Sequence, residues 1–205
     1  MNKINGDLMI KYIWLNPIVI NSYNLLELTL LLKEKKFTIV HPNKNHAEIV
    51  LNQYKDIKKN SKPILDQRCP LISAYFKINN INVNFYNIDP ILISTAKELS
   101  ETKELSDGIK FITTPCSALA QQGNKLKLKN TFFLTWDSFC LINDIYIKGK
   151  KLDNSPVPLG FFDKISDKIL KLTGDFHLKN LQNYEIIEGL YCENGCHNGD
   201  GVNNI

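Results

Sequence analysis

Short apolar runs that pass through a loop into a helix-like segment recur along this chain. The runs 35–41, 62–65, "VNFYNI" and "IKFITT" each lead into such a segment, and 130–136 adds one more strand. Consecutive parallel strands need a long crossover, and the helical segments between these runs supply it. The sequence therefore predicts an α/β fold of repeated β-α units around a mostly parallel sheet.

Several helices can be placed from their first residues and from their apolar spacing. We expect a helix over 23–34, another that has Pro70 in its first turn, and a third with Asp89 as N-cap and Pro90 at its first helical position. Proline fits the first turn because its missing N–H would have no partner there. The segment 161–172, "FFDKISDKILKL", has the apolar spacing of an amphipathic helix.

The composition is that of an ordinary globular protein. Hydrophobic residues make up 43% of the 205 residues and charged residues 22%. This is enough for one domain over 1–205, or for two small lobes at about 1–140 and 141–205. The net charge of +4 comes from lysines scattered along the chain, so we expect no nucleic-acid-binding surface.

The first twenty residues and the cysteine count bear on the compartment. Lys11, Asn16 and Pro17 interrupt the apolar start and no cleavage site follows, so we expect this segment to belong to the fold. No apolar run reaches the length of a membrane span. Five cysteines, an odd number without a secretory signal, favour a reducing compartment. We therefore expect a cytoplasmic protein.

Two cysteines follow predicted strands and precede predicted helices. Cys69 lies in "DQRCPL" and Cys116 in "TTPCSA". Both sulfurs should therefore lie at the carboxyl edge of the sheet, where open α/β sheets bind ligands. A helix N-terminus also favours the thiolate, the form that binds metals.

A second pair of cysteines closes the chain in "YCENGCHNGDG", after a predicted strand in "YEIIEGLY". Cys192 and Cys196 can join the first pair, with Gly195 allowing an unusual backbone conformation. Four cysteines suit a 4Fe–4S cluster, one thiolate for each iron. A single zinc ion is the competing metal, although zinc sites usually show two close pairs. We expect the tail to fold only with its metal, because residues 194–200 lack an apolar anchor.

Other cysteines and histidines receive smaller roles. Cys140, in an apolar segment, is interpreted as a buried free thiol. His197 follows Cys196 directly and is a candidate hydrogen-bond partner of the cluster, or alternatively a solvent-facing turn residue. The remaining histidines lack partners at ligand spacing and are interpreted as structural or surface residues: His41, His46 and His177.

Three segments resemble the catalytic domain of the FeFe hydrogenases. "NYEIIEGLYCENGCHNGDG" is similar to that family's closing strand, which leads into two cysteines separated by three residues and then a glycine-rich run. "RCP" at 68–70 resembles the family's Cys-Cys-Pro segment, and "TPC" at 114–116 its Met-Pro-Cys segment. The resemblance covers about 62–201 and implies a compact hydrogenase-like domain. The implied ligands of its 4Fe–4S cluster are Cys69, Cys116, Cys192 and Cys196, with Cys196 also bridging to a diiron unit.

The sequence departs from that family at three positions. Arg68, the only arginine, replaces the proton-carrying cysteine, Leu119 replaces a lysine that holds a diiron cyanide, and Gln122 replaces a relay glutamate. A guanidinium does not release a proton near neutral pH. Arg68 remains the candidate catalytic residue, as a cation that tunes the cluster potential or binds an anion. A 4Fe–4S cluster is therefore expected, and the diiron subcluster is the part that these replacements argue against.

Different classes of function follow from this pattern. The first is an iron–sulfur protein with a redox, electron-transfer or sensory role in anaerobic metabolism, served by a ferredoxin-like protein partner. An alternative is a minimal working FeFe hydrogenase, an oxidoreductase with an unconventional proton path. A second alternative is a zinc-stabilised interaction module. The replacements at Arg68, Leu119 and Gln122 favour the first class.

Overall fold

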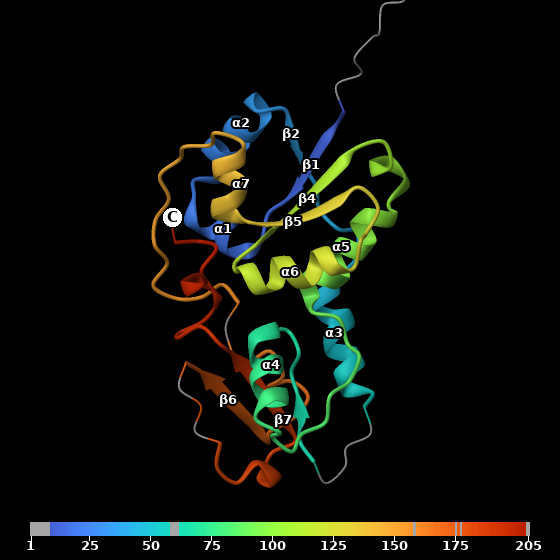
Figure 1. Ribbon diagram of the computed structural model, residues 1–205, viewed down its shortest axis with the longest axis vertical. Coiled ribbons are helices and arrows are strands. Elements are labelled where there is room, and N and C mark those ends of the chain that lie inside the picture. The colour runs from blue at the N-terminus through green and yellow to red at the C-terminus, as the bar shows by residue number, and fades with distance from the viewer. Residues whose placement is uncertain (1–8, 58–61, 158, 175, 177, 204–205) are drawn as a thin grey trace, which may run out of the picture.

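The chain folds into two parallel β-sheets with helices around them (Figure 1). The structure is a computed structural model that describes residues 9–57, 62–157, 159–174, 176 and 178–203. Strands and helices alternate along much of this length. The predicted α/β fold is therefore confirmed, with two separate sheets in place of one.

The larger sheet has four parallel strands in the order β2-β1-β4-β5. The strands are β1 (Lys11–Trp14), β2 (Phe37–Ile39), β4 (Ile109–Thr114) and β5 (Thr131–Thr135). β1 is an inner strand, so the apolar start of the chain belongs to the fold as expected. In the pairing of β1 with β4, Tyr12 lies opposite Lys110 and Ile13 lies opposite Phe111.

Helices cover both faces of this sheet, as parallel sheets require. On one face lie α1 (Pro17–Ser22), α2 (Leu25–Glu34) and α7 (Trp136–Ile142), and on the other α5 (Ile91–Glu101) and α6 (Ser117–Lys125). Buried side chains such as Phe139 on the first face and Phe133 on the second fill the two cores. Burial of one such ring contributes about 1.5–3 kcal/mol.

The smaller sheet has three parallel strands in the order β3-β7-β6. They are β3 (Ile64–Leu65), β6 (Ile169–Thr173) and β7 (Ile186–Leu190). Ile72 and Phe76 of α4 (Pro70–Ile78) pack on this sheet, and Val50 and Tyr54 of α3 (His46–Lys55) join its second core. Because β3 pairs with β7, the smaller sheet contains residues from both before and after residue 140. The two sheets therefore do not correspond to a division of the chain near that residue.

Side-chain caps explain where several helices begin. Asn16, Asn24 and Asn45 each accept hydrogen bonds from backbone N–H groups in the first turn of α1, α2 and α3. α4 begins at Pro70, as predicted. In α5 the N-cap is Pro90 and the helix begins at Ile91, so the predicted start is wrong by one residue.

Two predicted elements in the region of the smaller sheet are wrong. The segment 161–172 forms turns and then most of β6, although its apolar spacing suggested a helix. The reason is tertiary: Ile169 and Leu170 pair with β7, and Phe162 is needed in the core. "VNFYNI" forms only one bridge, from Asn84 to Ile64, because β3 is just two residues long and already pairs with β7.

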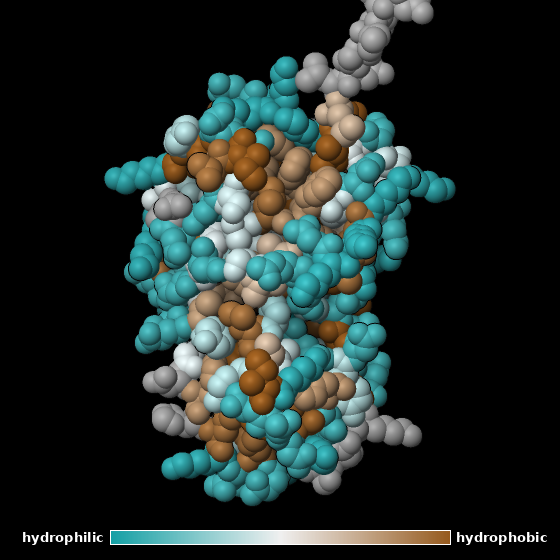
Figure 2. Space-filling model, in the orientation of Figure 1, coloured by the Kyte–Doolittle hydropathy of each residue, from teal (hydrophilic) through white to brown (hydrophobic). Residues whose placement is uncertain are grey.

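Apolar surface gathers on one side of the larger sheet. Leu141 and Ile142 of α7 are 75% and 65% exposed, and apolar residues lie over this helix in the space-filling view (Figure 2).

Within the described ranges, no helix has both the length and the apolar character needed to cross a membrane.

Candidate metal centre

Cys69 and Cys116 occupy equivalent positions in the two sheets. Cys69 follows β3 and is the N-cap residue of α4, while Cys116 follows β4 and is the N-cap residue of α6. Both therefore lie at the carboxyl ends of parallel strands, as predicted. The expected effect of the helix start on Cys116 is outweighed, because burial raises the pKa of this thiol to about 11 although the Leu119 N–H acts to lower it.

Cys192 and Cys196 lie in the tail that follows β7. The Gly195 N–H donates to the Cys192 carbonyl at 3.1 Å, which turns the chain between the two thiols. Gly195 has φ of +113°, and a Cβ there would lie 2.8 Å from the Cβ of Ser155. Only glycine fits this conformation without strain. The unusual backbone conformation predicted for Gly195 is therefore confirmed.

The tail is held by contacts of its own, contrary to the expectation that only a metal anchors it. Asp200 accepts hydrogen bonds from the backbone N–H and hydroxyl of Ser117, at the start of α6. Val202 is 5% exposed and packs in the core of the larger sheet. A Cβ on Gly199 would lie 2.3 Å from the Pro115 carbonyl, so the tail lies directly on the loop that carries Cys116.

Three of the four predicted ligands act electrostatically on the fourth, Cys196. Burial raises the pKa of Cys196, and negative charge on Cys69, Cys192 and Cys116 raises it further. The pKa values of Cys116 and Cys192 are raised by burial and by the same kind of mutual repulsion. Cys196 packs against the cores of both sheets. Four thiolates so close together would repel one another strongly without cations between them.

Cys140 does not share this environment. It packs against the core beneath α7, where burial and then the Asp137 carboxylate raise its pKa to about 12. A buried thiol with a raised pKa is unreactive. Cys140 is therefore a free thiol, as interpreted from the sequence, although it is partly buried rather than fully buried.

The two candidate metals need different spacings of the four sulfurs. Among the described residues, no group of three or more His, Cys, Asp or Glu side chains is arranged to hold a metal ion. A zinc ion with bonds of about 2.3 Å needs its sulfurs about 3.8 Å apart. In a cubane each thiolate binds a different iron, so the sulfurs stand farther apart.

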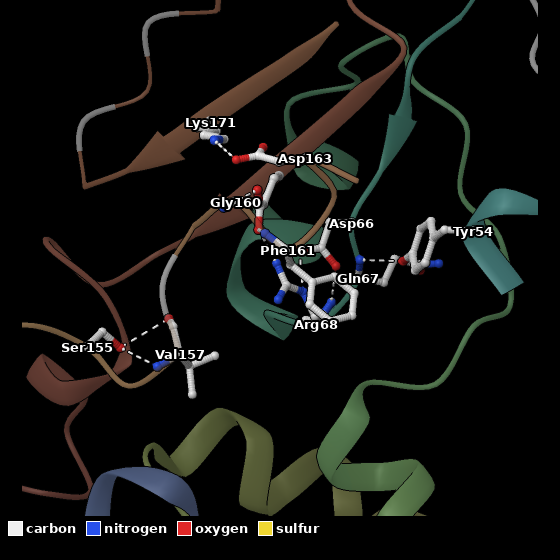
Figure 3. Close-up of polar contacts among 11 residues, drawn as sticks. Tyr54, Asp66, Gln67, Arg68, Ser155, Val157, Gly160, Phe161, Asp163 and Lys171 are labelled. Atoms are coloured by element: carbon white, nitrogen blue, oxygen red, sulfur yellow. Dashed lines mark hydrogen bonds and ion pairs between the residues drawn. The ribbon is translucent and has the colours of Figure 1, made fainter. Parts of the chain in front are cut away.

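Arg68 makes two buried ion pairs. Its Nε lies 2.8 Å from Asp66 Oδ2 and its Nη2 lies 2.6 Å from Glu188 Oε1, and neither carboxylate has any exposure (Figure 3). The guanidinium lies 4.3 Å from the ring centroid of Phe161. Glu188 also accepts the backbone N–H groups of Gly160 and Phe161. Arg68 thus joins β3, β7 and the 160–162 turn, and it is not a surface residue.

These ion pairs define what Arg68 does beside the thiols. Its positive charge acts to lower the pKa of Cys196, against the larger effect of burial. Asp66 is fully buried, and burial raises its pKa although Arg68 acts to lower it. Sequence analysis missed Asp66 and Glu188. The available signal was one acidic residue within the apolar run of β7, another directly after the apolar β3, and a single arginine in the chain.

An apolar cavity of about 130 Å³ lies beside Cys196, between the two sheets. Leu119 lines it at the position where the resemblance places a cyanide-binding lysine. Gln122 lies elsewhere, in a different cavity lined mainly by α4 and by the segment 86–90. Among the described residues that line the apolar cavity, Arg68 is the one charged residue, and its carboxylate partners occupy it. These residues do not fit a diiron unit of the hydrogenase kind.

The histidines divide into two environments. His197 is 9% exposed, so it is not a solvent-facing residue, and its Nε2 lies 3.4 Å from the Asn198 amide. His46, interpreted as structural or surface, is buried between Ser94 Oγ at 2.8 Å and Glu98 Oε2 at 2.7 Å. This contact ties α3 to α5. His177 lies outside the described residues.

Comparison with known proteins adds no relative: no family model, no curated protein and no solved structure matches this chain. The site is therefore defined by its own geometry. It consists of four thiols from two sheets, a neighbouring buried arginine with two carboxylates, and an apolar cavity.

Proposed function

We propose that the chain binds one 4Fe–4S cluster through Cys69, Cys116, Cys192 and Cys196 and has a redox, electron-transfer or sensory role. The observation that carries the proposal is that these thiols come from three separate segments and act electrostatically on one another. Each segment is a loop at the carboxyl end of a strand or the tail after it. A cluster would supply the cations that offset the mutual repulsion of the thiolates.

The surrounding groups support a cluster that exchanges electrons and performs no proton chemistry of its own. Arg68 keeps its charge at neutral pH, and its Nε and Nη2 donate to Asp66 and Glu188. We propose a ferredoxin-like protein partner as the electron donor or acceptor. Cys192 is half-buried, so the cluster edge on that side lies closer to the surface than the edge at Cys69.

The test is anaerobic purification and reconstitution of the full chain, with iron, sulfide and zinc measured per chain. We expect about four irons and four sulfides, as one cubane requires, and a visible absorption band that bleaches on reduction. Serine replacements of Cys69, Cys116, Cys192 and Cys196 should each lower the iron content. The matched control is Cys140→Ser, which should load as the wild type does.

Other outcomes would point to the alternative functions. One zinc per chain without iron would favour the zinc-stabilised interaction module. Sustained hydrogen evolution with a supplied diiron cofactor would favour a working hydrogenase. Full iron loading in a Cys192→Ala, Cys196→Ala double variant would contradict the proposal directly.

A further inference from the structure

Two buried polar atoms near the tail have no hydrogen-bond partner among the described residues. They are Ser22 Oγ, at the end of α1, and His197 Nδ1, in the turn after Cys196. Ser22 is 2% exposed and His197 is 9% exposed. A buried polar group without a partner is costly, so two of them in one place indicate a bound molecule.

Both residues line one cavity of about 120 Å³. Its walls are the end of α1, the segment 151–152 and residues of the tail between His197 and Asn203. Among the described residues that line it there is no cysteine, so its occupant would not be a ligand of the proposed cluster. Such a volume accommodates one molecule of about four or five heavy atoms.

The hydrogen bonds around His197 make its free nitrogen a donor. Asn198 Nδ2 donates to the Glu193 carbonyl at 3.0 Å, which fixes the orientation of the amide, and the same NH₂ group lies 3.4 Å from His197 Nε2. Nε2 therefore accepts, and the neutral imidazole carries its proton on Nδ1. The hydroxyl hydrogen of Ser22 can likewise rotate toward an acceptor.

The charge at the cavity is positive. Lys151 is the one charged side chain among the described residues that line it, and it is exposed. The Ser22 carbonyl already accepts from the Lys150 N–H at 2.8 Å, so it offers no free acceptor to a cation. Hydrogen-bond donors beside a cation suit an anion, and a polar occupant does not require a dry cavity.

We propose that this cavity binds a small oxyanion, a carboxylate or a phosphate, which accepts hydrogen bonds from Ser22 Oγ and His197 Nδ1 and pairs with Lys151. The recognition uses no metal, so the site does not depend on the proposed cluster. An anion held there contacts α1 and the tail together and therefore stabilises their packing.

The test titrates the full chain with sodium acetate and, separately, with inorganic phosphate, at an ionic strength held constant with sodium chloride. We expect saturable shifts of the amide NMR signals of the tail, and the anion that binds more tightly identifies the ligand class. Ser22→Ala should weaken binding about tenfold, because a hydrogen bond to a charged group is lost. Lys151→Met should weaken it about threefold, because this charge is exposed.

The matched control is Lys150→Met, at the neighbouring exposed lysine outside the lining of the cavity, which should bind as the wild type does. Without either anion, Ser22→Ala should unfold at the same temperature as wild type, since its hydroxyl has no hydrogen bond to lose. A lower unfolding temperature would show that Ser22 already has a partner and would overturn the inference.

Shifts that do not saturate with either anion, or equal binding in wild type and a folded Ser22→Ala variant, would also overturn it. Iron content is measured in the same samples. Saturable anion binding in a chain that takes up no iron would uphold this site while the cluster proposal fails, and iron loading without anion binding would do the reverse.

Discussion

Loss of Arg68 should be costly to the fold, because its guanidinium is the ion-pair partner of two carboxylates that have no contact with water. Its partners Asp66 and Glu188 belong to two different strand regions of the smaller sheet. Removing one member of a buried ion pair leaves an uncompensated charge, which is far more costly than losing an exposed pair.

We therefore expect Arg68→Met to lower the free energy of unfolding by about 3–5 kcal/mol. Urea denaturation of the metal-free chain measures the change. The matched control is Lys171→Met, which breaks the ion pair with Asp163, whose two side chains are 39% and 53% exposed. The control replacement should lower the free energy of unfolding by less than about 1 kcal/mol. Equal losses in the two variants would show that the buried ion pairs add no more to stability than an exposed pair.

A second residue-level expectation concerns Glu98 and pH. Burial acts to raise the pKa of this carboxyl, but hydrogen bonds from the Asn43 N–H and from His46 outweigh it, so the pKa lies below its ordinary value of 4.5. A lowered pKa in the folded state contributes stability above pH 4.5 that is lost as pH falls through the folded-state pKa.

Glu98→Gln should therefore destabilise the chain at neutral pH, with the difference from wild type shrinking as pH drops below about 4.5. Thermal unfolding between pH 3 and 7 measures this difference. Glu101→Gln, an exposed position on the same helix, should show no such pH dependence. A difference from wild type that stays constant over this range would contradict the assignment of the Glu98 carboxylate as the group involved.

At the scale of elements, the contact between the tail and α6 decides how Cys196 is held. Asp200 acts as a cap for α6 from outside the helix, since the N-cap position itself is taken by Cys116. The thiol at that position makes no side-chain capping bond in α6. Helix α6, which begins directly after the proposed ligand Cys116, is therefore capped by the tail that carries the proposed ligand Cys196.

We expect Asp200→Ala to lower the free energy of unfolding by about 1 kcal/mol, the usual loss when a helix N-terminal cap is removed. Chemical denaturation gives the value, with the exposed loop variant Asp153→Ala as control. The loss should be accompanied by faster proteolysis near residues 195–203. A variant as stable and as resistant as wild type would show that the Asp200 contact with α6 does not hold the tail.

The elements also show where sequence patterns succeed. Pro70 and the run 109–114 predicted α4 and β4 because local chemistry and apolar content agreed with the tertiary structure. The prediction of a helix over 161–172 is wrong because the apolar residues Phe161 and Phe162 suit a helix as well as a turn that packs on Arg68. Short apolar runs leave that choice to their neighbours.

At the scale of the whole molecule, the proposed cluster would cross-link the two sheets. Cys116 belongs to the larger sheet, Cys69 and Cys192 to the smaller one, and Cys196 packs against both cores. A metal that binds only the folded state adds its binding free energy to folding.

Iron loading should therefore slow hydrogen exchange in the loops of both sheets, at 67–70 and 114–117, as well as in the tail. Mass spectrometry of loaded and chelated protein measures this directly. Loaded Cys140→Ser serves as control and should be protected as the wild type is. Protection confined to the tail would mean that the metal binds Cys192 and Cys196 without joining the sheets.

The sequence by itself determined the α/β class, the helix starts at Pro70 and near Pro90, and the positions of the four cysteines after strands, because these depend on neighbouring residues and on periodicity. Only the tertiary structure decided that the strands form two sheets, since β3 pairs with β7 more than a hundred residues later. It also decided that Arg68 is buried between Asp66 and Glu188, because no local pattern links Arg68 to Glu188, which lies 120 residues later in the chain. The convergence of the thiols follows from the same long-range pairing, which places the carboxyl ends of both sheets against one tail.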